Sequence, residues 1–181
     1  IKNISSQDVT LSNISAHSGP TSVESNGSIT FNIASGTLTL SGNITGDGRI
    51  IKTGSGQLNL EGTNTFTGGL RIADGNAQLG SSSLPTTGTT LQLGGSAVLK
   101  VSSATPDYSG IMTFDSTSSY LRISVPAGDT YTMASSITSQ TGGILSKRGD
   151  GKLVLGANFD FGGGATIYGG DLVVGTGGTT G

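Results

Sequence analysis

The feature that most constrains this chain is an internal repeat. Residues 48–80 and 143–175 align without a gap, with each position of the second copy 95 residues after its counterpart. Glycines and alternating apolar residues recur at the same offsets, which is typical of a unit that stacks on a copy of itself. The repeat-defining residues are Lys52, Gly54, Gly56, Leu58, Leu60, Phe66, Gly68 and Gly69 in the first copy and Lys147, Gly149, Gly151, Leu153, Leu155, Phe161, Gly163 and Gly164 in the second.

A weaker similarity extends the repeat towards the N-terminus. Residues 28–36 are similar to residues 120–128, and residues 38–45 are similar to residues 131–138. Each copy is therefore about 95 residues long and is clearest over residues 28–80 and 120–175. Because stacked repeats share one continuous core, we expect residues 1–181 to form a single elongated domain.

The composition by itself would also suit a disordered linker. Glycine accounts for 32 of 181 residues, and only 11% of the residues are charged. The placement of the apolar residues argues against disorder, because they alternate strictly with polar ones at 38–40, 58–60, 91–93 and 121–125. No helical periodicity persists over three turns. The pattern therefore predicts an all-β chain with no significant helix.

Two all-β architectures fit the short strands and turns. The dipeptides Asn26-Gly27, Asp47-Gly48, Asp74-Gly75 and Asp150-Gly151 would suit the hairpins of an antiparallel sandwich or barrel. A right-handed parallel β-helix, or β-solenoid, accounts for the long repeat as well, with about 18–25 residues per coil and about 4.8 Å between coils. We therefore predict the β-helix, with these side chains facing inward: Leu58, Leu60, Ile72, Leu153, Leu155 and Ile167.

Charge and hydropathy exclude two classes of partner. The formal net charge is −2, and no basic run is longer than Lys147-Arg148, so the concentrated positive surface that nucleic acid requires is missing from the sequence. No apolar stretch approaches the ~20 residues of a membrane-spanning helix. The chain has no cysteine, which is compatible with an oxidising extracellular environment.

The residues that could carry chemistry are few and scattered. His17 is the only histidine and lies in a loop-like run, so we interpret it as a surface residue rather than a catalytic base. The carboxylates are scattered, and four of the eleven adjoin glycines in expected turns, namely Asp47, Asp74, Asp129 and Asp150. Asp150, Asp160 and Asp171 could meet if the coils stack them. We predict no catalytic residue, no metal site and no cofactor.

Two kinds of repeated side chain have structural interpretations. We expect Lys52 and Lys147 to be solvated corner residues whose aliphatic stems cover apolar surface. We expect Phe66 and its counterpart in the second copy to stack inside the solenoid. The richest aromatic cluster is the only candidate for contact with a carbohydrate and consists of Phe159, Phe161 and Tyr168.

The segment 52–69 reads K-T-G-S-G-Q-L-N-L-E-G-T-N-T-F-T-G-G and is followed by Ile72 and Gly75. It closely resembles the autotransporter-associated β-strand repeat. The second copy resembles that family less closely, because Arg148 replaces a threonine and residues 157–161 depart from the family's pattern.

The resemblance implies a parallel β-helix in the passenger region of a bacterial surface or secreted protein, with a structural, adhesive or aggregating role and no enzymatic activity. One alternative is a subunit of an extracellular filament in which β-helices stack head to tail. Another alternative, from a different class, is a carbohydrate-active β-helix enzyme. A cell-surface receptor or a glycan would be the expected ligand of an adhesive module.

The ends of the chain bear on the choice between a module and a filament. Residues 179–181 repeat residues 86–88, and no amphipathic helix precedes the alternating residues 9–11. No membrane-embedded barrel follows Gly181, which favours a fragment of a longer passenger or a relative that reaches the surface another way. We therefore expect uncapped ends and either self-association or continuation of the stack.

Overall fold

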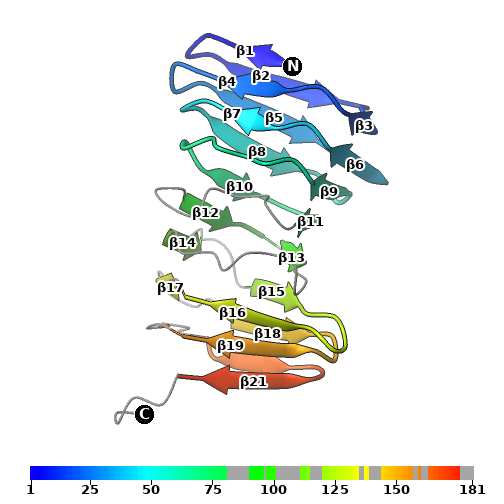
Figure 1. Ribbon diagram of the computed structural model, residues 1–181, viewed down its shortest axis with the longest axis vertical. Helices are drawn as coiled ribbons and strands as arrows, with labels where there is room; N and C mark the ends of the chain where they lie inside the picture. Colours follow the sequence, from blue (N-terminus) through cyan, green and yellow to red (C-terminus); the bar gives the residue numbers. More distant parts are fainter. Residues whose placement is uncertain are drawn as a thin grey trace.

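The computed structural model is an elongated stack of parallel β-strands that runs from the N-terminus at one end to the C-terminus at the other (Figure 1). It describes residues 1–80, 90–95, 97–100, 111–114, 120–134, 137–138, 144–156, 159 and 163–175. Every pairing between these strands is parallel, and no described residue is helical. Accordingly, no candidate for a membrane-spanning helix occurs among the described residues. The predicted all-β solenoid is confirmed, and the antiparallel sandwich is wrong.

The strands form three faces, which the chain visits in turn over residues 2–60, whereas over residues 70–124 the described strands alternate between the second and third faces. The first face consists of β1 (Lys2–Asn3), β4 (Thr21–Val23) and β7 (Ile44–Thr45) near the N-terminus, and of β16 (Thr130–Met133), β19 (Lys152–Leu155) and β21 (Asp171–Val174) near the C-terminus. These two groups share one name because each of their strands after β1 follows a strand of the third face in the order of the chain.

The other two faces are continuous sheets. The second face has seven strands: β2 (Asp8–Ser12), β5 (Ser28–Asn32), β8 (Arg49–Thr53), β10 (Leu70–Ile72), β12 (Thr90–Leu93), β14 (Ile111–Phe114) and β17 (Ile137–Thr138). The third face has eight strands: β3 (Ala16–His17), β6 (Thr37–Leu40), β9 (Gln57–Leu60), β11 (Asn76–Leu79), β13 (Val98–Lys100), β15 (Tyr120–Ser124), β18 (Ile144–Arg148) and β20 (Ala165–Ile167).

Consecutive coils are offset by about twenty residues. The shortest offset among paired strands is 19 residues, between Gln57 and Asn76, and the longest is 25, between Met112 and Ile137. Both values lie within the predicted range. The right-handed sense of coiling stays a prediction that rests on the general preference of parallel crossovers.

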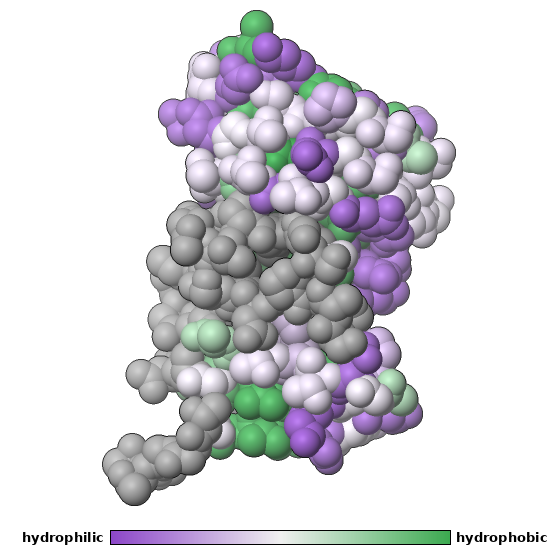
Figure 2. Space-filling view, viewed as in Figure 1, coloured by the Kyte–Doolittle hydropathy of each residue, from purple (hydrophilic) through white to green (hydrophobic). Residues whose placement is uncertain are grey.

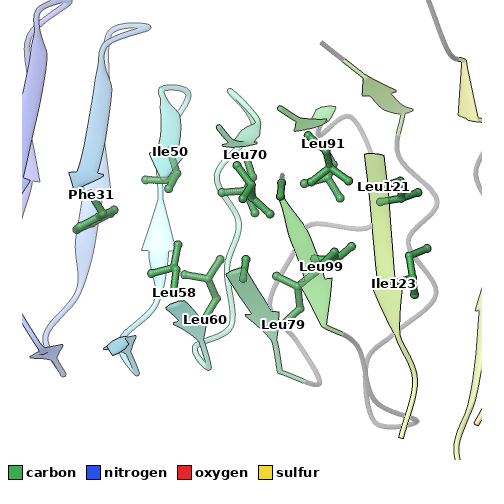
Figure 3. Close-up of a cluster of buried hydrophobic side chains, with 14 of the residues drawn as sticks. Phe31, Ile50, Leu58, Leu60, Leu70, Leu79, Leu91, Leu99, Leu121 and Ile123 are labelled. Atoms are coloured by element: carbon green, nitrogen blue, oxygen red, sulfur yellow. The ribbon is translucent and has the colours of Figure 1, made fainter. Parts of the chain in front are cut away.

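The core is a set of inner rows in which an apolar side chain of one coil packs on that of the next (Figure 3). Along β9 and along β19 exposure alternates, so that Leu58, Leu60, Leu153 and Leu155 are buried while the residues before them point outward. Phe66 is also fully buried, as predicted. The period-two pattern of the sequence therefore identifies the inner face of each strand correctly.

Ile167 lies in the predicted inner row, but it is not buried. Its counterpart in the first copy, Ile72, lies between Lys52 and Leu93 of the neighbouring coils and has no exposed surface. Ile167 lies opposite Lys147 in β20, the last strand of the third face, and 51% of it is exposed. Burial at this position therefore depends on the following coil, not on the residue itself.

The two copies of the repeat lie on different faces of one stack. Lys52 belongs to β8 of the second face, whereas Lys147 belongs to β18 of the third. Four steps along the second face lead from β8 to β17, and the chain then passes to the third face before it reaches Lys147. A 95-residue period therefore equals four coils plus one face. The copies are rotated relative to one another and do not stack directly, contrary to the simplest interpretation of the repeat.

The alternation in β19 gives a matched pair of substitutions. Leu155→Asp places a carboxylate among the buried leucines and should lower the free energy of unfolding by at least about 3 kcal/mol. Val154→Asp introduces the same group on the outer side of the same strand and should cost much less. Thermal unfolding followed by circular dichroism measures both, and equal effects would contradict the assigned inward and outward directions.

Candidate functional site

The structure does not place His17 in a catalytic arrangement. Its Nε2 lies 3.2 Å from the N-terminal nitrogen of Ile1 and 3.4 Å from the carbonyl oxygen of Pro20. His17 thus lies in β3, an end strand of the third face, and not in the predicted loop-like run, and neither partner is a carboxylate or a hydroxyl or thiol nucleophile. The interpretation of His17 as a surface residue stays in place.

The stacking of coils was expected to bring Asp150, Asp160 and Asp171 together. Two of these carboxylates lie close to the amino group of Lys147. Asp150 and Asp171 both lie near enough to the amino group of Lys147 to raise its pKa. Asp160 lies outside the described residues. The described residues contain no cluster of three groups that would suit a metal ion. The convergence of Asp150 and Asp171 therefore compensates the charge of a lysine.

A second pair of carboxylates, not foreseen from the sequence, lines an open groove of about 390 Å³ between the first and second faces. Asp8 accepts a hydrogen bond from Oγ of Ser28 at 2.7 Å, and Asp47 accepts one from the backbone N–H of Asn26 at 3.2 Å. Arg49 lines the same groove. Each carboxylate thus has a partner in the neighbouring coil, Asp8 from the start of β2 and Asp47 from a turn.

The main site missed by sequence reasoning is the interior of the solenoid at Lys52. Its side chain has no exposed surface, so the prediction of a solvated corner residue is wrong. In its inner row Lys52 lies between Phe31 and Ile72. The amino group donates hydrogen bonds to the carbonyl oxygens of Thr53 at 3.2 Å, of Asp74 at 2.9 Å and of Gly54.

Lys147 repeats this arrangement on the third face. It too has no exposed surface, and it lies between Ile123 and Ile167 in its inner row. Its amino group donates to the carbonyl oxygens of Arg148 at 3.2 Å, Gly149 at 2.6 Å and Gly169 at 2.9 Å. Each ammonium group has three donor hydrogens, so three carbonyls satisfy it fully. We call Lys52 and Lys147, each with its three carbonyls, the corner lysines.

Glycine recurs 23 residues after each corner lysine, where a β-carbon would lie 2.5 Å from the carbonyl oxygen of Gly54 at Gly75 and closer still to that of Gly151 at Gly170. The third carbonyl belongs to the next coil, so the amino group ties the turns of two successive coils together. Gly75 and Gly170 follow those carbonyls with φ of 73° and 63°. A β-carbon at Gly75 would lie 2.7 Å from Nζ of Lys52, and one at Gly170 would lie 2.8 Å from Nζ of Lys147. Lysine and glycine are therefore parts of one packing unit.

Burial and the negative charge of nearby carboxylates shift the pKa of the corner lysines in opposite directions. Removal from water lowers the pKa of Lys52 below the usual 10.5, and the negative charge of Asp74 opposes this effect. Burial likewise lowers the pKa of Lys147, against the charges of Asp150 and Asp171. Because the interior is costly for a charge, the carbonyls and the nearby carboxylates are what make a lysine tolerable there.

A second side-chain link joins the coils on the first face. Asn64 is buried, and its Oδ1 accepts the backbone N–H of Ile44 at 2.8 Å. In the opposite direction, Oδ1 of Asn43 accepts the backbone N–H of Thr63 at 3.0 Å. The two asparagines add to the backbone hydrogen bonds that the N–H groups of Thr65 and Thr67 donate to Ile44 and Gly46 where the chain passes between β9 and β10. The Asn-Thr pair in the repeat motif was the available signal, but the sequence alone does not show which N–H it caps.

The residues proposed for carbohydrate contact have different environments. Phe159 is partly buried and packs against the hydrophobic core. Tyr168 is 67% exposed, and the guanidinium carbon of Arg148 lies 4.8 Å from the centre of its ring. Phe161 lies outside the described residues. Of the two described residues, Tyr168 has the more exposed side chain, and its contact with a glycan stays a prediction.

The outer side of the third face carries a polar strip. We define the amide–cation strip as the outward residues Gln57, Asn59, Gln78, Lys100, Arg122 and Arg148. Side-chain hydrogen bonds connect its first part: Nε2 of Gln57 donates to Asn59 at 2.6 Å and to Gln78 at 3.2 Å. Lys100 donates to Oε1 of Gln57 at 2.6 Å. Figure 2 shows hydrophilic surface on the side where β9, β11 and β13 lie in Figure 1.

Comparison with known protein families gives one match, found twice. The family model described as the passenger-associated-transport-repeat matches residues 50–76 and 145–174, together 57 of the 181 residues. Each match contains one corner lysine and its glycine. The resemblance inferred from the sequence is thereby confirmed. No curated protein and no solved structure matches the chain.

Removal of a corner lysine should destabilise the stack. Lys52→Met keeps the length of the side chain but leaves three carbonyls without their donor, so we expect a loss of about 1–3 kcal/mol in the free energy of unfolding. Lys152→Met, on the exposed outer side of β19, removes the same charge and should change stability by less than about 0.5 kcal/mol. Denaturant unfolding of both variants measures the difference. An unaffected midpoint in Lys52→Met would contradict the role of the carbonyl contacts.

The lowered pKa of the corner lysines should make stability depend on pH. The unfolded chain binds these protons more tightly than the folded chain, so the free energy of unfolding rises with pH between the lowered pKa and 10.5. Below the folded pKa both states are protonated and the contribution is constant. Wild type should therefore gain stability relative to the Lys52→Met/Lys147→Met variant as pH is raised from neutrality towards 10.5. Paired denaturant titrations measure this difference, and a relative loss over that range would contradict the direction of the shift.

Proposed function

Because the chain carries two passenger-associated transport repeats within one β-solenoid, we propose that it is a module of the passenger region of a bacterial surface or secreted protein. The observation that carries the proposal is the repeat itself, matched twice and placed in a single stack. The module acts outside the cell. Its role is structural and adhesive, and it makes contacts through its long outer faces.

The arrangement of the side chains supports this role over an enzymatic one. A glycosidase needs two carboxylates across the bond that is cleaved. Asp150 and Asp171 instead lie around the buried amino group of Lys147, and Asp8 and Asp47 each have a hydrogen-bonding partner in the neighbouring coil. The carbohydrate-active enzyme is therefore the alternative with the least support among the described residues.

The filament alternative has support of its own at the C-terminal coil. Ile167 and Val174, which lie in inner rows, are 51% and 71% exposed, and Figure 2 shows hydrophobic surface at this end of the stack. In the interior of the stack the next coil covers such positions. A further coil on this end, from the same chain or from a second copy, would bury them in the same way.

Display on bacterial cells tests the adhesive role. We expect cells that carry the chain fused to an unrelated surface anchor to settle and attach to abiotic surfaces faster than cells that carry the anchor alone. Cells that display Leu155→Asp at the same level are the control for an intact fold. No difference between the intact chain and the anchor alone would contradict the adhesive role, and rods that lengthen with concentration in electron micrographs of the purified chain would favour the filament.

A further inference from the structure

We propose that the amide–cation strip on the third face binds an acidic, carboxylate-bearing polysaccharide that lies along the axis of the stack. The inference deepens the proposed function, on which it rests, by naming one face and one class of ligand. It is built on the distribution of charge over the three faces, on the spacing of the cations and on the contacts that hold them.

The first argument is the segregation of charge. The chain as a whole has a formal net charge of −2, yet none of the eight strands of the third face contains an aspartate or a glutamate. On the first face Lys152 lies opposite Asp171 in the neighbouring strand. On the second face Arg49 shares its groove with two carboxylates. The third face is therefore the face whose lysine and arginine side chains belong to strands without any aspartate or glutamate.

The second argument is spacing. Lys100, Arg122 and Arg148 lie on the successive strands β13, β15 and β18. Arg122 is opposite Val98, and Arg148 is opposite Ser124, so the cations alternate between two outer rows. With about 4.8 Å between coils, one positive charge follows another in a zigzag along the axis. An extended polyanion that runs across the strands along the row of Ser124 would meet Lys100 and Arg148, which lie two coils apart.

The third argument is that two of these cations are held in place without being neutralised. Lys100 reaches back across β11 and is fixed by the amide oxygen of Gln57 at 2.6 Å. The guanidinium of Arg148 lies 4.8 Å from the centre of the Tyr168 ring. An uncharged partner orients a cation but leaves its charge available to an anion. Fixed side chains also lose less conformational entropy when a ligand binds.

The composition of the strip favours a polysaccharide over a phosphate polymer. Gln57, Asn59 and Gln78 present amide groups, which both donate and accept hydrogen bonds, as the hydroxyl groups of sugars require. Tyr168 adds an exposed ring at the C-terminal end of the face. Nucleic acid would require a denser positive surface, and the net negative charge of the chain opposes it. An acidic polysaccharide, with widely spaced carboxylates among many hydroxyl groups, matches the strip better than a nucleic acid does.

Binding of polygalacturonate to the purified chain tests the proposal. The variant Lys100→Gln/Arg148→Gln removes two cations of the strip and should weaken binding at least about tenfold at low salt. The matched control Arg71→Gln/Lys152→Gln removes one arginine and one lysine from the other two faces and should weaken it by less than about threefold. Equal thermal unfolding of the three proteins by circular dichroism establishes that the fold is intact.

The neutral polymer dextran and single-stranded DNA are the comparison ligands. We expect no measurable binding of dextran, weaker binding of DNA than of polygalacturonate, and loss of polygalacturonate binding as salt is raised. The proposal is overturned by absence of polygalacturonate binding, by an equal loss in both variants, by equal binding of dextran, or by tighter binding of DNA through the same residues. Because this assay uses the purified chain, its outcome is independent of cell attachment. Polymer binding without attachment would count against the adhesive role alone, and attachment without polymer binding would count against this inference alone.

Discussion

The packing of each coil on the next is the interaction on which the rest of the structure depends. A single coil has too few residues to enclose a core, so its inner side chains are buried only when a neighbouring coil covers them. Ile72 and Ile167 show this directly, since they occupy the same position of the repeat and differ from fully buried to half exposed. Backbone hydrogen bonds between coils fix the spacing, and the inner rows supply the apolar contact.

The corner lysines follow from the same constraint. Turns between faces leave backbone carbonyls without partners in the strand ladder, and buried carbonyls without donors are costly. A lysine in the inner row reaches the corner and supplies three donors, one of which goes to the next coil. The amino group thereby loses its contact with water and links the turns of two successive coils. Its stem still fills space in an apolar row, between Phe31 and Ile72 in the first copy.

Burial of the inner rows also leaves the outer faces free to differ. Outward residues on the three faces take part in no core contact, so their charges can vary without affecting the stack. Lys152 and Asp171 are neighbours on the first face, whereas the third face combines amides with Lys100, Arg122 and Arg148. The flat, regular spacing of these rows is a property of the solenoid, and it makes each face a candidate for contact with an extended partner.

The sequence alone determined the class of fold and the inner positions. Strict alternation at 58–60 and 153–155 requires one buried side per strand, and the long repeat requires a stack, so the parallel solenoid and its leucine rows could be predicted. The relation between residues distant in the sequence emerged from the coiling of the chain. The repeat period is four coils plus one face, so the two copies occupy different sides of the stack. Whether Lys52 pointed inward or outward depended on carbonyls from Gly54 and Asp74 that converge only after the coils have formed. The amide–cation strip likewise brings together residues from several coils, because side chains about twenty residues apart in the chain become neighbours only when their strands pair.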